Sequence, residues 1–128
     1  MNQPAPARLL VVDDEDVLSR VTARRLRNRG YVAETAGSGG EALALLGKEH
    51  FDLVLLDLMM PGMGGLEVLR AIRELWPSSR LRVLVLTART DRETLDEARA
   101  RGADGVVIKP PVFDELLAEI RRNLGQEG

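Results

Sequence analysis

The chain has 128 residues, which is enough for one domain with a sizeable hydrophobic core. Its formal net charge of -2 gives no reason to expect nucleic-acid binding across the surface, and the absence of cysteine excludes disulfides and cysteine-based metal or redox chemistry. No apolar run approaches the roughly 18 residues of a membrane span, and the first residues lack the layout of a signal peptide, so we expect a cytoplasmic protein that does not bind membranes.

Short apolar runs alternate along the chain with amphipathic segments of helical length. The predicted strands cover, in chain order, residues 9–12, 31–35, 51–56, 81–86 and 105–108. The predicted helices follow them in turn, at about 15–29, from Ser38 onward, at about 65–75, at 91–101, and over the segment that carries Leu116 to Leu124. Gly30 ends the first helix, and Ser38 with Glu41 has the spacing of a capping box. We expect a flexible tail at 1–7 and a single domain at 8–125.

This alternation predicts the fold class. Five units of strand followed by helix are typical of an α/β protein, in which helices cover both faces of a parallel sheet. The strands are nearly continuous apolar runs, as expected where both faces of a sheet are buried. The sequence therefore predicts a five-stranded parallel sheet, doubly wound with five helices.

Polar side chains stand at the ends of four predicted strands. Asp13 and Asp14 follow the first strand and Asp57 follows the third, whereas Thr87 and Lys109 follow the fourth and fifth. In open α/β sheets, ligands bind outside the carboxyl ends of the strands, where the strand order reverses. If the first and third strands are neighbours, three carboxylates converge there and repel one another unless a cation joins them. A hard divalent ion such as Mg²⁺ suits these oxygen ligands.

The same groups suit phosphoryl transfer. A metal ion and Lys109 neutralise charge on a moving phosphoryl group while a carboxylate oxygen attacks phosphorus in line. Asp57 is the preferred nucleophile because it stands alone at the end of its strand. Asp13 and Asp14 are then the metal ligands, and Thr87 supplies a hydroxyl donor.

Four motifs resemble the receiver domain of two-component response regulators, including the chemotaxis regulators. They are Leu10-Val-Val-Asp-Asp-Glu15, Leu55-Leu-Asp-Leu-Met-Met-Pro-Gly62, Val85-Leu-Thr-Ala88 and Gly102-Ala-Asp-Gly-Val-Val-Ile-Lys-Pro110. Their order and spacing match the family over residues 8 to 124. The resemblance implies a flavodoxin-like sheet with the strand order 2-1-3-4-5. It also implies a phosphorylation-controlled signalling switch.

The resemblance assigns a role to each candidate residue. Asp57 would accept a phosphoryl group from the phosphohistidine of a sensor histidine kinase or a histidine phosphotransfer protein. Thr87 and Lys109 would contact the phosphoryl oxygens, and the peptide bond between Lys109 and Pro110 would be cis. The implied Mg²⁺ ligands are three carboxylates and one backbone carbonyl, from Asp13, Asp14, Asp57 and Met59. We expect no enzyme activity beyond Mg-dependent self-phosphorylation and autodephosphorylation.

The switch region departs from the family pattern. It comprises Ala88, Arg89 and Val106, and family members commonly carry Tyr or Phe at position 106. A β-branched valine is stiff and small, so we expect the signal to pass instead through the loop after Thr87 and the sparsely apolar helix at 91–101.

Two side chains bear on the lifetime of the phosphoryl group. Met59 and Arg89 lie two residues after Asp57 and Thr87, where we expect them to hinder the attacking water.

Other functions fit the sequence less well. A phosphatase of the haloacid-dehalogenase type needs a second aspartate at position 59, and a P-loop motif is absent. The acids at 13–16 would repel the phosphate that a flavodoxin binds. An interaction module that keeps the fold without phosphorylation remains open.

The organisation of the whole protein also remains open. We expect no output domain in this chain and no direct nucleic-acid binding by this domain, so the chain either stands alone or is the receiver of a longer regulator. A homodimer through the fourth and fifth helices is also open.

Overall fold

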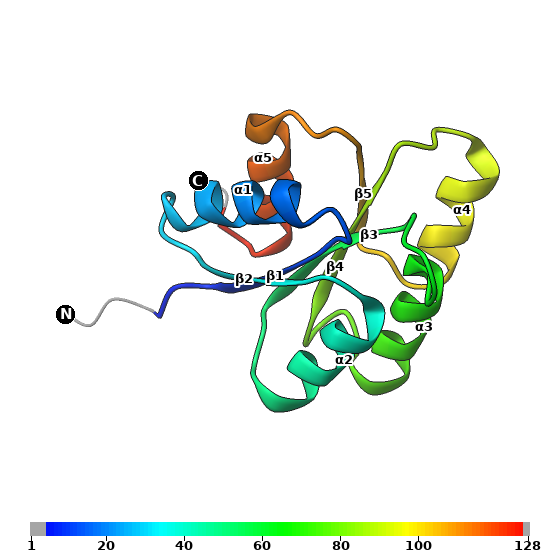
Figure 1. Ribbon diagram of the computed structural model, residues 1–128, viewed down its shortest axis with the longest axis horizontal. Helices are drawn as coiled ribbons and strands as arrows, with labels where there is room; N and C mark the ends of the chain where they lie inside the picture. Colours follow the sequence, from blue (N-terminus) through cyan, green and yellow to red (C-terminus); the bar gives the residue numbers. More distant parts are fainter. Residues whose placement is uncertain (1–4, 127–128) are drawn as a thin grey trace.

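Five parallel strands form one sheet in the order β2-β1-β3-β4-β5, which confirms the predicted topology (Figure 1). The computed structural model describes residues 5–126. The elements are β1 Arg8–Val12, α1 Asp16–Arg27, β2 Val32–Ala36, α2 Gly39–Lys48, β3 Leu53–Asp57, α3 Gly65–Leu75, β4 Arg82–Thr87, α4 Arg92–Ala100, β5 Gly105–Ile108 and α5 Phe113–Asn123. Of the predicted tail, residues 1–4 lie outside the described residues, and residues 5–7 have no regular structure.

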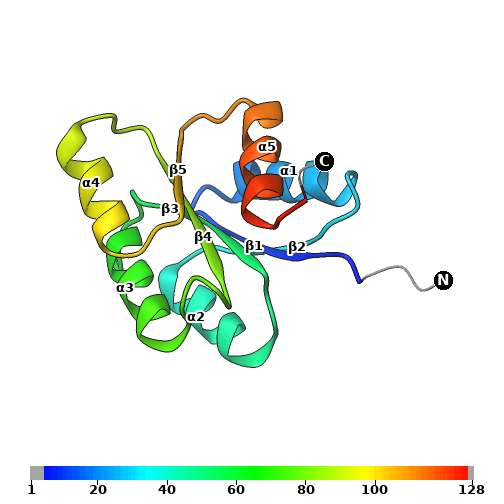
Figure 2. The ribbon, with the colours of Figure 1, turned by 180° about the vertical axis from the view of Figure 1, so that it is seen from behind.

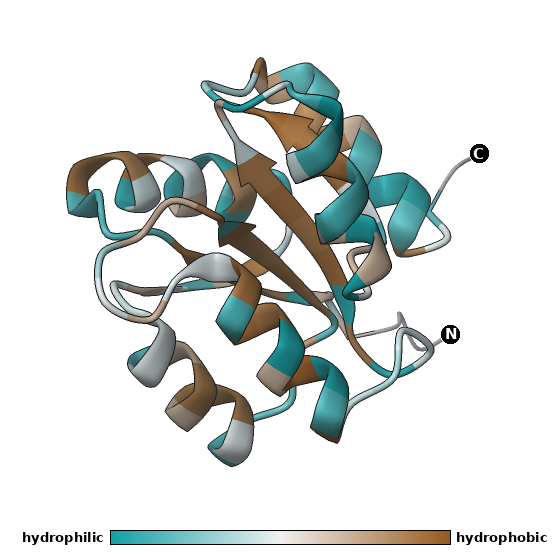
Figure 3. Cartoon of the chain, turned by 90° about the vertical axis from the view of Figure 1, so that its right-hand side faces the viewer, coloured by the Kyte–Doolittle hydropathy of each residue, from teal (hydrophilic) through white to brown (hydrophobic). Residues whose placement is uncertain are grey.

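Helices cover both faces of the sheet. α1 and α5 lie on one face, and α2, α3 and α4 lie on the other, as the two opposite views show (Figures 1 and 2). Each face has its own hydrophobic core, one around Leu55 and Ile120 and the other around Leu56 and Ile72. The strands are mainly apolar, whereas the helices carry polar residues on their outer sides (Figure 3). Within residues 5–126, no helix is long and apolar enough to cross a membrane.

The predicted element boundaries are shifted by one or two residues in several places. The third strand begins at Leu53 and not at Phe51, whose side chain is nevertheless buried in the core. The capping box at α2 is present in altered form. The Ser38 hydroxyl accepts a hydrogen bond from the amide of Glu41, but the Glu41 carboxylate accepts from the amide of Gly37 and not from Ser38. The cap still satisfies two backbone donors at the start of the helix, the amides of Gly37 and Glu41.

The first turn of α3 packs directly on the end of β3. A Cβ atom at Gly65 would lie 2.5 Å from the carbonyl oxygen of Asp57 and 2.5 Å from the Cα of Leu58. Both atoms belong to the backbone, so neither moves away at low cost. The absence of a side chain at Gly65 therefore allows the close approach that positions Asp57.

We predict that Gly65→Ala lowers the free energy of unfolding by about 1–3 kcal/mol, because the methyl group overpacks this contact. Gly40→Ala is the matched control, since Gly40 lies in α2 with open space at its Cβ position. Alanine favours the helix there by up to about 1 kcal/mol. Thermal and denaturant unfolding of both variants measure the two effects, and equal stabilities would contradict the close packing at Gly65.

Candidate functional site

The polar residues predicted from the sequence lie at the carboxyl edge of the sheet. Asp13 follows β1 and Asp57 is the last residue of β3, and these two strands are neighbours. Thr87 is the last residue of β4, and Lys109 follows β5. Because the strands are parallel, all four ends open toward the same edge.

Three carboxylates gather at this edge. Each of Asp13, Asp14 and Asp57 offers a carboxylate oxygen, and these oxygens lie within 4.8 Å of one another. Asp13 and Asp57 are buried, with 7% and 3% of their surface exposed, whereas Asp14 is exposed. Oxygen ligands in such a cluster suit a hard divalent cation. We call these three residues the acidic cluster.

Lys109 supplies the positive charge at the centre of the site. Its Nζ lies 3.0 Å from Asp13 Oδ2, 3.1 Å from Glu15 Oε1 and 3.2 Å from Asp57 Oδ2. A lysine ammonium has three N–H donors, so each carboxylate takes one. Burial alone would lower the pKa of Lys109, but the hydrogen bonds to Asp13 and Glu15 and the charges of Asp57 and Asp13 outweigh it, and the pKa is raised. Lys109 therefore stays charged.

The Asp57 carboxylate is held from two sides. Its Oδ1 accepts a hydrogen bond from the backbone amide of Met59 at 3.1 Å, and its Oδ2 accepts from Lys109. Burial raises the pKa of Asp57, the Met59 amide and the Lys109 charge oppose that rise, and the Asp13 charge adds to it. The net result is a raised pKa, as expected for a buried carboxylate beside a second one.

Thr87 lies at the next strand end but contacts the loop that follows it. The Thr87 side chain is fully buried, and its Oγ1 accepts a hydrogen bond from the amide of Arg89 at 3.0 Å. Within residues 5–126, its hydroxyl makes no hydrogen bond to the acidic cluster. The Arg89 side chain turns toward α4, where its Nε lies 2.9 Å from Asp91. Ala88 is exposed, and Val106 packs half-buried against the core on the α4 side of the sheet.

The sequence did not identify Glu15 as part of the site. Its carboxylate takes the third donor of Lys109 although the two residues are 94 positions apart. Glu15 is also the N-cap residue of α1, but its side chain makes no capping hydrogen bond. The run of acids at 13–16 was the available signal, but it does not show which of them turns toward Lys109.

Comparison with known proteins agrees with this geometry. Residues 9–121 match the response regulator receiver domain family. The chain belongs to this family. The receiver is 39% identical over 117 residues to the DNA-binding response regulator MtrA of Mycolicibacterium smegmatis, a match that covers 91% of the chain and 50% of MtrA. The receiver thus spans about half the length of this curated relative.

Solved receiver structures share its fold. A CheY-like receiver domain protein from Methanospirillum hungatei JF-1 has a TM-score of 0.88 and 31% identity, with 94% of this chain and 95% of that chain covered. The response regulator TrrA from Thermotoga maritima, solved in complex with Mg(2+)-BeF, has a TM-score of 0.82 and 36% identity, with coverages of 92% and 99%. The acidic cluster of this receiver has the composition of a metal site, and metal ions occur in such relatives.

We predict that Asp14→Ala removes most of the affinity of the receiver for Mg²⁺, because a hard cation loses a carboxylate ligand. Without metal, the same change raises the free energy of unfolding, since it relieves repulsion within the acidic cluster. Melting curves with and without MgCl₂ measure both effects. Asp16→Ala is the control, because Asp16 is an exposed neighbouring acid outside the cluster that pairs with Arg20. A metal-dependent rise in Asp14→Ala equal to that of the unmodified receiver would exclude the role.

Proposed function

We propose that this receiver is a phosphorylation-controlled switch in which Asp57 accepts a phosphoryl group from a phosphohistidine. The environment of the Asp57 carboxylate is the observation that carries the proposal. The group is buried, yet its two oxygens are fixed by the Met59 amide at 3.1 Å and by Lys109 Nζ at 3.2 Å. A carboxylate fixed in this way is oriented for in-line attack, and its charge is partly compensated.

The transfer forms a bond between a carboxylate oxygen of Asp57 and phosphorus. It breaks the bond between phosphorus and the imidazole nitrogen of the donor, and the electron pair leaves with the imidazole, which takes up a proton. Lys109 already lies beside Asp57, so its ammonium donates to an oxygen of the arriving phosphoryl group, where negative charge gathers. The Thr87 hydroxyl donates to another phosphoryl oxygen.

Mg²⁺ is the ion that we propose for the acidic cluster. Its ligands would be the three carboxylates of the cluster and the backbone carbonyl of Met59, which are the hard oxygen donors this ion prefers. When bound, Mg²⁺ neutralises charge on the transferred group. With these parts the receiver supports its own phosphorylation from small phosphodonors and its own dephosphorylation, without a further enzyme activity.

The proposed partner is a sensor histidine kinase or a histidine phosphotransfer protein, in the cytoplasm. MtrA is described as DNA-binding, but this chain spans half of MtrA, and we propose that this domain does not itself bind nucleic acid. The acidic edge and the net charge of -2 support that view. α4 and α5 flank the edge strand β5 and remain available for a homodimer (Figure 2).

We predict that acetyl phosphate with Mg²⁺ adds one phosphoryl group to the receiver and none to Asp57→Asn, because the amide is a poor nucleophile. Intact-mass measurement reads the added group directly. Asp52→Asn is the matched control, since Asp52 precedes β3 at the opposite edge of the sheet and pairs with His50.

Two outcomes would count against the proposal. Equal labelling of the receiver and Asp57→Asn would show that another residue is the acceptor. No labelling of either protein, by acetyl phosphate or by a phosphorylated kinase, would favour an interaction module that keeps the fold without phosphorylation.

We also predict that Met59→Ala shortens the half-life of the phosphoryl group. The Met59 side chain is 60% exposed and lies two residues after Asp57, where an apolar chain hinders the attacking water. Its loss should lower the barrier by about 1–2 kcal/mol, which is roughly ten-fold or more in rate. Arg89→Ala should have the smaller effect, because Asp91 holds Arg89 at the start of α4. The decay of the added mass measures the rate, with Met63→Ala as the control, and an unchanged half-life would refute the prediction.

A further inference from the structure

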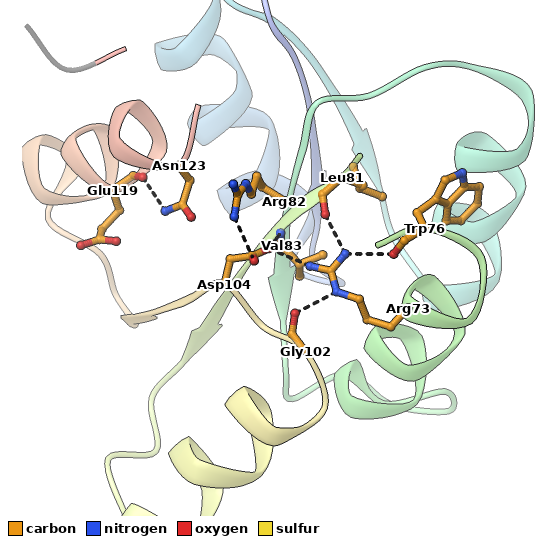
Figure 4. Close-up of polar contacts among 9 residues, drawn as sticks. All are labelled: Arg73, Trp76, Leu81, Arg82, Val83, Gly102, Asp104, Glu119 and Asn123. Carbon is orange, nitrogen blue, oxygen red and sulfur yellow. Dashed lines mark hydrogen bonds and ion pairs between the residues drawn. The ribbon is translucent and has the colours of Figure 1, made fainter. Parts of the chain in front are cut away.

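Arg73 of α3 joins three segments of the chain (Figure 4). They meet at the amino edge of the parallel sheet, opposite the acidic cluster. Its guanidinium donates to three backbone carbonyls and one carboxylate: Gly102 O at 2.9 Å, Trp76 O at 3.1 Å, Leu81 O at 2.7 Å and Asp104 Oδ2 at 2.7 Å. The acceptors belong to the end of α3, the start of β4 and the turn between α4 and β5. One side chain therefore holds all three together.

Asp104 completes this network from the other side. Its Oδ2 accepts a hydrogen bond from the amide of Val83 at 2.8 Å, and its own amide donates to the carbonyl of Val83 at 2.8 Å. The ion pair is largely buried, with 14% of the Arg73 side chain and 10% of the Asp104 side chain exposed. Loss of Asp104 would leave the largely buried charge of Arg73 without a carboxylate partner, which would be strongly destabilising.

The turn after α4 packs closely against the side chain of Arg73. Gly102 has a φ of +109°, and a Cβ atom there would lie 2.7 Å from Cγ of Arg73. The amide of Ala103 donates back to the carbonyl of Ala98, which is the buried residue of α4. The carboxyl end of α4 is therefore fixed to α3 and to β4.

The amino end of α4 is held by few contacts in the described part of the chain. Residues 88–93 are all exposed. The contacts there are the hydrogen bond from the Arg89 amide to Thr87 Oγ1, the ion pair between Arg89 and Asp91, and the cap that Asp91 forms on Thr94. The ion pair between Arg89 and Asp91 is exposed and stabilises little. Another of these contacts uses the Thr87 hydroxyl, which the proposed phosphoryl group would also engage.

We infer that the ion pair of Arg73 with Asp104 is a hinge about which α4 swings when the Thr87 hydroxyl turns from the Arg89 amide to a phosphoryl oxygen. The inference rests on the proposed function and adds the direction of the movement. Gly102 stays in place during this movement, and the loop after Thr87 is displaced. Phosphorylation then displaces the first turn of α4 and leaves the start of β5 in place.

A swing and a translation of α4 predict different displacements. A helix rises about 1.5 Å per residue, so position 93 lies about 14 Å from Gly102 along the helix axis and position 100 about 3 Å. A swing about Gly102 therefore moves position 93 about four times as far as position 100. A translation of the helix moves both positions equally.

Spin labels measure this ratio, and the absence of cysteine in the chain restricts labelling to introduced positions. Glu74→Cys on α3 is the reference, paired with Glu93→Cys in one protein and Ala100→Cys in another; all three positions are exposed. Arg70→Cys provides a second reference. A movement perpendicular to the line from position 74 leaves that distance unchanged, but it changes the distance from position 70. Distances are compared with and without Mg²⁺ and beryllofluoride. We expect the change at position 93 to be about four-fold larger than the change at position 100.

Asp104→Asn tests the hinge itself, because it removes the charge that holds Arg73 while keeping the size of the side chain. The ratio should fall toward one in Asp104→Asn and stay unchanged in Asp96→Asn, a control at an exposed carboxylate of α4. Equal displacements in the unmodified receiver, no displacement at either label, or an unchanged ratio in Asp104→Asn would overturn the hinge. If Asp104→Asn does not fold, the hinge is tested by the distances to positions 93 and 100 in the receiver without that substitution. Failure of beryllofluoride to raise the melting temperature would instead contradict the proposed function, and the hinge with it.

Discussion

One ammonium group among four carboxylates is the constraint on which the site depends. Lys109 Nζ lies within 3.2 Å of oxygens from Asp13, Glu15 and Asp57, and Asp14 adds a further negative charge nearby. A single lysine cannot balance four carboxylates, so the edge of the sheet retains negative charge. The edge therefore suits a divalent cation, and we propose that an anionic group approaches Asp57 when that cation and Lys109 together face it.

The sheet brings these charges together by its strand order. β1 and β3 are neighbours at its centre, so the residues that end them, Asp13 and Asp57, lie side by side although long stretches of chain separate them. β3 is buried along its whole length, and the close approach of Gly65 to the Asp57 carbonyl fixes where that strand ends. The framework thus positions the carboxylate, and a carboxylate held in place lowers the reorganisation that the proposed reaction requires.

The alternation of strands and helices was sufficient to predict the α/β class, and the resemblance to receiver domains supplied the strand order. The members of the acidic cluster then follow from which residue ends each strand. Contacts that depend on the direction of one side chain were not predictable in this way. Glu15 reaches Lys109 across 94 positions and Arg73 reaches Asp104 across 31, and no periodic pattern links either pair. The direction of Arg89 was also missed, because its contact with Asp91 depends on the path of a loop. Strand ends shifted by one or two residues because a buried side chain such as Phe51 does not by itself define where backbone pairing begins.

The exposure of residues 88–93 has a consequence for how receivers diverge. None of these side chains contributes to either hydrophobic core, so exchanges among them leave the folding free energy nearly unchanged, except at Asp91, which caps α4. The ties at Arg73 and Asp104 have no such freedom, since each satisfies a buried charge. Substitutions in the loop beside the acidic cluster therefore change the folding free energy little, whereas substitutions at the opposite edge of the sheet are destabilising. Receivers with this arrangement can therefore change the lifetime of their phosphorylated state by substitutions in one surface loop, while the sheet and its helices stay the same.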